Sequence, residues 1–60
     1  MFNEALKEAR IKKKWSQERL ARHLEVSLQT VRNWESGRAV PVGYNIEATA
    51  KFISDEKGEE

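Results

Sequence analysis

The chain has 60 residues, of which 35% are charged; its formal net charge is +1 and it contains no cysteine. A chain this short forms one small domain, and without cysteine it has neither disulfides nor thiolate metal sites. No apolar stretch approaches the roughly 18–20 residues that span a bilayer, and polar residues interrupt residues 1–10, where a signal peptide would lie. We therefore expect a cytoplasmic protein with no membrane partner, no metal and no cofactor.

Charge is distributed unevenly along the chain. Residues 1–40 carry nine Lys or Arg against five Glu, whereas residues 41–60 carry two Lys against five acidic residues. A basic body followed by an acidic tail suits a protein that meets a polyanion with one surface. Ordinary solvated charged faces give a similar asymmetry, so the pattern alone does not decide between the two.

The first predicted helix runs from about Asn3 to Lys13. Asn3 suits an N-cap, and Glu4 in the first turn favours the helix dipole. Its predicted inner stripe is formed by Leu6 and Ala9, with Phe2 as a third apolar contact.

Two shorter helices are predicted in the stretch 16–38, at about 17–24 and 28–35. Each start has an N-cap serine, Ser16 or Ser27, preceded by an apolar residue and followed by another at the fourth helical position. This is the hydrophobic-staple spacing, and its repetition eleven residues later is specific. The pattern predicts two short helices joined by a tight turn, an arrangement that can be presented to the major groove of DNA.

Gly37 is a natural residue to end the third helix. A fourth helix is predicted from about Gly43 to Ser54, with the inward side chains Ile46, Thr49, Ala50 and Ile53. We assign residues 1–54 to one helix-turn-helix DNA-binding domain and residues 55–60 to a flexible acidic tail.

The predicted helix 28–35 separates into two faces. At about 100° per residue, Leu28, Gln29, Arg32 and Asn33 share one side, together with Ser36, and Val31 and Trp34 lie on the other. Gln and Asn can pair with adenine, Arg with guanine, and Leu can touch a thymine methyl group. An amphipathic helix with a solvated outer side would look the same in isolation, but the preceding helix and turn favour base reading.

Phosphate contacts are expected at two places that flank this face. Ser16 and Gln17 stand at the start of helix 17–24, where free backbone N–H groups attract anions. Ser36 and Arg38 follow the reading helix, where anchoring to the DNA backbone is expected. Ser16 has a plainer role as a helix cap, and we expect it to serve as the cap as well.

Residues 5–54 resemble the lambda-repressor-like helix-turn-helix family of the Cro/C1 type. The matching positions keep the family spacing without gaps: Leu6, Arg10, Trp15, Ser16, Gln17, Leu20, Ala21, Leu24, Val26, Ser27, Thr30, Val31, Trp34, Glu35, Gly37 and Pro41. The resemblance implies an all-α, compact bundle of four helices, or of five as in other members. It also implies a transcriptional regulator, most often a repressor, that binds double-stranded DNA as a homodimer on a palindromic operator.

By the same resemblance, Leu28, Gln29, Arg32 and Asn33 carry over as base-contacting positions. Gln17 and Ser36 carry over as phosphate-contacting positions. In many members an arginine and a glutamate at the positions of Arg10 and Glu35 form an ion pair, so we expect that structural pair here.

The chain departs from the family pattern at three points. Glu25 replaces the glycine that is common in the turn between the second and third helices, and Lys14 replaces a glycine after the first. A residue other than glycine in left-handed geometry costs roughly 1 kcal/mol. No fifth helix is predicted, so a dimer contact would have to come from Tyr44, Phe52 or Ile53.

A second hypothesis belongs to another class, an antitoxin-like or other protein-interaction module with a toxin-like partner. An exposed apolar patch around Tyr44, Phe52 and Ile53 would favour it. We expect no enzymatic activity, because nothing in so short a chain builds a pocket around paired carboxylates. His23, the single histidine, is expected to be neither a ligand nor catalytic, and both tryptophans are expected in the core.

Overall fold

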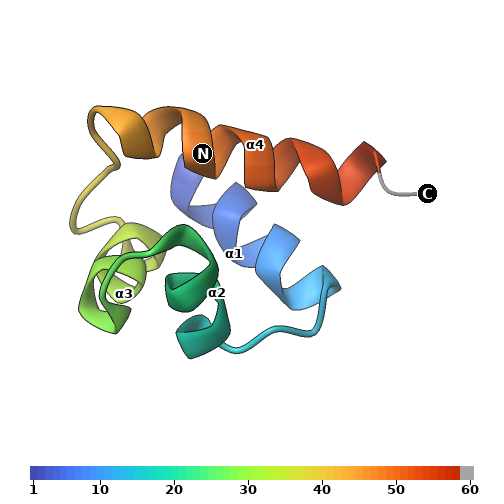
Figure 1. The fold of residues 1–60 in the computed structure, drawn as a ribbon, viewed down its shortest axis with the longest axis horizontal. Coiled ribbons are helices and arrows are strands. Elements are labelled where there is room, and N and C mark those ends of the chain that lie inside the picture. The colour runs from blue at the N-terminus through green and yellow to red at the C-terminus, as the bar shows by residue number, and fades with distance from the viewer. Residues whose placement is uncertain (59–60) are drawn as a thin grey trace.

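The computed structural model describes residues 1–58, with side chains described up to Asp55. It contains four helices in the order α1 (Phe2–Lys12), α2 (Gln17–Leu24), α3 (Leu28–Ser36) and α4 (Tyr44–Gly58), with no strand within residues 1–58. In Figure 1, α4 lies across the top of the molecule, above α1, and α2 and α3 lie below. α1 packs against α3 and α4, and α2 packs against the same two helices. The expected all-α fold is therefore confirmed.

Eight apolar side chains from all four helices form one core. They are almost fully buried: Leu6, Ala9, Leu20, Ala21, Leu24, Val31, Trp34 and Phe52. Trp15 is half-buried and packs against this cluster rather than inside it. Because a core of this size stabilises a domain only modestly, the ends of the helices contribute a large share of what holds the chain in one conformation.

Serine side chains begin both helices of the central pair, as predicted. Ser16 Oγ accepts a hydrogen bond from the Arg19 backbone N–H at 3.0 Å, and Ser27 Oγ accepts one from the Thr30 N–H at 3.1 Å. Each cap satisfies one of the N–H groups that a helix start leaves without a partner, which stabilises the helix by about 1 kcal/mol. The predicted span 17–24 matches α2, and α3 continues one residue beyond the predicted 35.

The first three helices end in the same way. Lys14, Glu25 and Gly37 follow the three helices with φ angles of 62°, 61° and 83°, which are left-handed values. After α2, for example, the Val26 N–H bonds the Ala21 carbonyl at 3.0 Å and the Glu25 N–H bonds the Arg22 carbonyl at 3.2 Å. This pair of bonds is the Schellman motif. Lys14 and Glu25, which replace glycines of the family pattern, thus both have left-handed backbone conformations.

The start of α1 differs from the prediction. The helix begins at Phe2 with Met1 as the N-cap residue, and no side chain caps it. Asn3 lies inside the first turn, half-buried, with its amide beside Gly37 at the end of α3. The expected N-cap role of Asn3 is therefore wrong, because its side chain packs against another helix instead of its own backbone.

α4 differs more. It starts at Tyr44 and continues through Gly58, four residues past the predicted end at Ser54. The sequence Asp-Glu-Lys after Ser54 holds no helix breaker, and Gly58 is the first residue that favours an end. Residues 59–60 of the predicted tail lie outside the described residues. Within residues 1–58, no helix is both long enough and apolar enough to cross a membrane.

The buried face of α4 is also rotated from the predicted one. Thr49 and Phe52 are buried, but Ile46 and Ala50, which we expected to face inward, are exposed, and Ile53 is half-buried. The Thr49 hydroxyl donates to the Asn45 and Ile46 carbonyls (2.8 and 3.2 Å), so its burial leaves no polar group without a partner.

Phe52 explains the rotation. Its ring lies 5.5 Å from that of Trp15 and 5.8 Å from that of His23, measured between centroids. An aromatic side chain buries more apolar area than Ile46 or Ala50 would. Tyr44, Phe52 and Ile53 therefore do not form the exposed apolar patch that would favour a protein-interaction module: Phe52 is in the core and Tyr44 borders a different depression from Ile53.

Replacing Glu25 with glycine is expected to raise the free energy of unfolding by about 0.5–1 kcal/mol. Glycine adopts the φ of 61° at no steric cost, although it loses more entropy on folding. Urea unfolding followed by circular dichroism measures the change. The matched control is Glu18→Gly, in the ordinary helical backbone of α2, which is expected to destabilise by a similar amount. If both variants had an equally lower free energy of unfolding than the wild type, the prediction would be contradicted.

Candidate nucleic-acid interface

The outward side of α3 carries the four side chains predicted to contact bases. Gln29 and Arg32 are exposed, and Leu28 and Asn33 are half-buried. The opposite side of the helix is anchored by the buried residues Val31, Trp34 and Glu35. The helix therefore presents a polar row to solvent while its other face is held in the core.

Two of these side chains are joined to each other. Gln29 Nε2 donates a hydrogen bond to Asn33 Oδ1 at 3.0 Å, one helical turn away. The bond ties the two amides together: exposed Gln29 retains one N–H and its Oε1 for other partners, and Asn33 retains its Nδ2 group as a donor. The pair thus offers donors and an acceptor next to one another, which is the pattern that an adenine edge complements.

The predicted phosphate-contacting residues lie at the start of α2 and the end of α3. Ser16 and Ser36 are exposed, as is Arg38, and Gln17 is half-buried. Gln17 is hydrogen-bonded to Glu35, which precedes Ser36, so the start of α2 and the end of α3 are neighbours. The structure therefore brings Gln17 to the last turn of α3, which Ser36 ends.

A buried ion pair holds this junction. Arg10 Nε and Nη2 donate to the two carboxylate oxygens of Glu35 at 2.7 and 3.1 Å, in a fork geometry. The third guanidinium nitrogen, Nη1, donates to the Trp15 carbonyl at 2.9 Å. The side chain of Glu35 is 4% exposed and that of Arg10 is 12% exposed. The expected pair thus joins α1 to α3 and to the residue before the α2 cap.

Gln17 completes the same network. Its Nε2 donates to Glu35 Oε1 at 3.1 Å. A carboxylate only accepts hydrogen bonds, so Glu35 holds the Gln17 amide with its nitrogen at the junction, and the second N–H of that nitrogen is left for another acceptor. A phosphate oxygen is such an acceptor. Sequence reasoning missed this contact, because residues 18 positions apart leave no local periodic signal.

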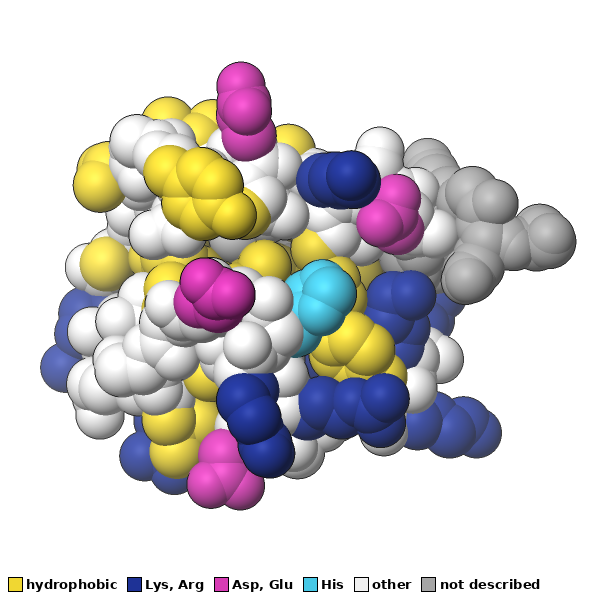
Figure 2. Space-filling model, viewed as in Figure 1, with side chains coloured by type: hydrophobic (Ala, Val, Ile, Leu, Met, Phe, Trp, Pro, Cys, Tyr) yellow, Lys and Arg dark blue, Asp and Glu magenta, His cyan; other side chains and the backbone are white. Residues whose placement is uncertain are grey.

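Basic side chains surround the start of α2. Figure 2 shows Lys and Arg side chains gathered on the lower and right parts of the face in view, over α2 and the end of α1. The Arg19 guanidinium lies 4.5 Å from the Trp15 ring centroid, and Lys13 Nζ lies 5.8 Å from it. These contacts place the two cations beside the ring of Trp15, the residue before Ser16. Among the described residues no group of three acidic, histidine or cysteine side chains could hold a metal ion.

Comparison with known proteins agrees with this geometry. Residues 6–52 match the helix-turn-helix family. The chain belongs to the Cro/C1 type of the helix-turn-helix family. The match covers all of α2, α3 and the network that joins them, and it confirms the resemblance drawn from the sequence.

One curated relative of this helix-turn-helix chain is the HTH-type transcriptional activator BcrR of Enterococcus faecalis, which is 40% identical over 53 residues. Those residues make up 88% of this chain and 26% of the relative, so the chain spans about a quarter of the length of that protein. No solved structure gives a significant match.

Removing one partner of the buried pair is expected to cost far more than removing both. Arg10→Met leaves the Glu35 carboxylate buried without its guanidinium, at a cost of about 3–5 kcal/mol. That is most of the stability of a small domain, so the helical signal should collapse. The double variant Arg10→Met/Glu35→Met should recover much of it, as measured by urea unfolding. A double variant no more stable than Arg10→Met would contradict this account.

Proposed function

We propose that this chain is a sequence-specific DNA-binding domain that regulates transcription, with α3 inserted into the major groove. The observation that carries the proposal is the row of amide and guanidinium side chains on the outward face of α3. The opposite face of the same helix is buried in the core, which holds this row in place. The family and the relative from Enterococcus faecalis, named as a transcriptional activator, support regulation of transcription rather than an enzymatic role.

The proposed base contacts follow from chemistry. Arg32 has the forked donors that match O6 and N7 of guanine, and the Gln29–Asn33 pair has the donors and acceptor that match adenine. Leu28 is half-buried at the start of α3 and suits contact with a thymine methyl group. We assign these four side chains to base reading.

Register on the DNA would come from the backbone. The N–H groups at the start of α2, the remaining N–H of Gln17 Nε2 and the Ser16 hydroxyl are donors for phosphate oxygens. The Ser36 hydroxyl donates to the Asn33 carbonyl at 3.2 Å, and on DNA it would turn to donate to a phosphate instead. Arg38 adds charge just past α3. Such contacts orient the domain without reading the base sequence. Removing one is therefore expected to weaken binding to all DNA sequences equally.

We propose that two copies bind a palindromic operator, with half-sites about 34 Å, one helical turn, apart. A domain of this size that occupies a promoter blocks access to it, so repression is the proposed sign. The relative is named as an activator, and a promoter–reporter assay with and without the chain distinguishes the two signs. An exposed apolar patch around Tyr44, Phe52 and Ile53 would favour the antitoxin-like alternative; because Phe52 is buried, we do not propose that alternative.

Selection from a randomised duplex library, followed by salt titration on the enriched site, tests the proposal. We expect enrichment of a defined half-site and an affinity at least about a thousandfold above that for random duplex. Weak binding that falls steeply with salt and ignores sequence would overturn specific reading.

Arg32→Ala is expected to weaken binding to the selected site by about 1–3 kcal/mol and to relax preference at one base pair. Arg38→Ala is the matched control: it removes the same group from a proposed phosphate contact. It should weaken binding to all sequences alike and lower the salt slope by about one. Library selection with each variant measures both. Uniform weakening by Arg32→Ala would assign Arg32 to phosphate.

Gln29 and Asn33 are expected to act as one unit, because each orients the other through the 3.0 Å hydrogen bond. Gln29→Ala and Asn33→Ala should each lose most of the discrimination at the same base pair, and the double variant should lose little more. A double-mutant cycle on the selected site should give a coupling of about 1 kcal/mol. Additive losses at two different base pairs would contradict the coupling.

A further inference from the structure

One side of α2 is buried, and the other side exposes two arginines. Arg19 and Arg22 are both exposed, and they stand three residues, or about 4.5 Å, apart along the helix axis. Lys14, in the turn before α2, is exposed as well. Together with the half-buried ring of Trp15, these three cations form a surface that we name the basic edge, and none of its residues belongs to α3.

Trp15 holds one end of the basic edge in place. The Arg19 guanidinium lies 4.5 Å from the centroid of the Trp15 ring, which is a cation–π distance. The Trp15 carbonyl accepts a hydrogen bond from Arg10 Nη1 at 2.9 Å, and this bond fixes the backbone beside the ring. A guanidinium held on an aromatic ring has already lost part of its rotamer freedom and keeps N–H groups at its rim for an anion. This end of the basic edge is therefore ordered without a partner.

Within residues 1–55, whose side chains the structure describes, no carboxylate is paired with the basic edge. Glu18 and Glu25 flank Arg19 and Arg22 along the chain, yet neither forms an ion pair with them. The depression that the two arginines line with Trp15 and the single histidine contains no acidic residue. Two cations three residues apart on a helix repel each other, so an anion bound beside them would relieve that repulsion.

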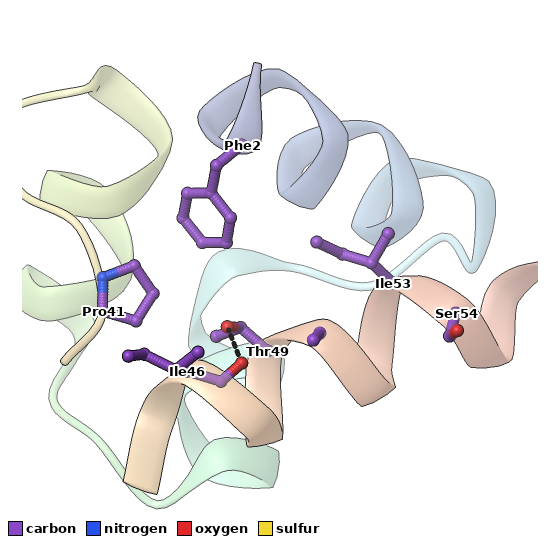
Figure 3. Close-up of a pocket in the computed structure, with 7 residues that line it drawn as sticks. Phe2, Pro41, Ile46, Thr49, Ile53 and Ser54 are labelled. Carbon is purple, nitrogen blue, oxygen red and sulfur yellow. Dashed lines mark hydrogen bonds between the residues drawn. The ribbon is translucent and has the colours of Figure 1, made fainter. Parts of the chain in front are cut away.

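The apolar depression between α4 and the start of α1 has the opposite character. Figure 3 shows Phe2, Pro41 and Ile46 around this space, with Ile53 farther along α4. Among the described residues, no charged side chain lines it. A polyanion is attracted by clustered cations, so the α2 side of the molecule suits such a partner and the side shown in Figure 3 does not.

We propose that the basic edge binds the phosphate backbone of DNA that flanks the bases read by α3. The edge begins at the start of α2, where the Arg19 N–H bonds Ser16 Oγ at 3.0 Å, so it adjoins the proposed phosphate position of Ser16. Phosphates of one strand follow one another every 3.4 Å or so along the DNA axis. The separation of Arg19 and Arg22 along α2 is of the same order, so each guanidinium suits a phosphate of its own.

The inference rests on the proposed function for the placement of α3 and lengthens the contact with DNA. The contact would fall outside the base pairs that α3 reads, because the edge lies on the face of α2 that neither the core nor α3 covers. It would add affinity and salt dependence on every sequence, since phosphates carry no base identity.

Lys14 fits this role in a way that glycine would not. Its φ of 62° is left-handed, a conformation that is costly for a residue with a Cβ atom. Backbone strain of this kind is concentrated at binding sites. A lysine at this position is explained if its ammonium group contacts DNA, because glycine would fit the backbone better but carries no charge.

Lys14→Gly separates binding from stability. Glycine relieves the left-handed strain, so the variant should unfold at a higher urea concentration than the wild type. The same change removes one cation, so the slope of log K against log salt, measured on the selected duplex, should become shallower by about 0.9. A variant that is more stable yet binds DNA with a shallower slope is the expected result.

The double variant Arg19→Gln/Arg22→Gln removes the two guanidiniums. Its salt slope should become shallower by about 1.8, so its affinity should fall about twelvefold less than that of the wild type between 50 and 200 mM salt. Arg19→Lys keeps the charge and should keep the slope. The matched control is Lys51→Gln, which removes an exposed cation from α4 and should leave the slope unchanged. Circular dichroism of each variant should match that of the wild type.

Duplex length tests the flanking position. On a duplex limited to the selected base pairs, the wild type and the double variant should bind with similar affinity. Adding about ten base pairs, one helical turn, to each end should strengthen wild-type binding at 50 mM salt at least about tenfold more than binding of the double variant.

Unchanged salt slopes in Lys14→Gly and in the double variant would overturn the inference and leave the basic edge to an acidic protein segment. Equal gains of the wild type and the double variant on the longer duplex would overturn the flanking position and with it the inference. The proposed function fails separately. If the variants lower the slope but the wild type selects no sequence, specific reading alone is wrong; if the wild type selects a site and the slopes are unchanged, the basic edge alone is wrong.

Discussion

The buried contact between Arg10 and Glu35 is the interaction on which the arrangement of the first three helices depends. It crosses 25 residues of sequence, and its third nitrogen holds the Trp15 carbonyl, one residue before the cap of α2. A charged pair excluded from water contributes little net stability by itself, yet it is costly to break. Its value here is geometric: a forked donor and a planar carboxylate bond in one orientation, so α1, α2 and α3 have one way to meet.

Short-range chemistry does the rest of the positioning. Each of α2 and α3 is begun by a serine hydroxyl, and each of the first three helices is closed by a left-handed residue. The core then needs only to hold the helices together, because their lengths and the directions of their connections are already defined. A chain with eight buried apolar side chains would otherwise have little to select one packing over another.

The parts of the fold that could be predicted from sequence are those with local signals. Ser16, Ser27 and Gly37 mark helix ends by their own chemistry, and the left-handed positions at Lys14 and Glu25 follow from the family pattern. α4 could not be placed well, because both Ile46 and Phe52 lie on stripes that suit burial. The choice depended on Trp15 and His23, which meet Phe52 only in three dimensions.

The same division holds for the candidate site. The outward row on α3 follows from helical periodicity, and the structure keeps those side chains accessible. The Gln17–Glu35 contact could not be predicted, since it needs the start of one helix to meet the end of another. The orientation of the Gln17 amide is thus a property of the tertiary fold, although the residue type was recognisable in the sequence.

The turn between α2 and α3 spans three residues, and the backbone N–H groups of its left-handed Glu25 and of Val26 both donate to carbonyls of α2. Adding one residue there would separate the left-handed Glu25 that ends α2 from the Ser27 cap that begins α3, and would disturb the entry of α3 into the core. Substituting the outward residues themselves would leave that geometry untouched, because none of them is part of the core cluster. Folding therefore constrains the length of this turn but not the identity of the outward side chains. Those side chains can change during evolution, and a new DNA sequence can be recognised, while the backbone stays the same.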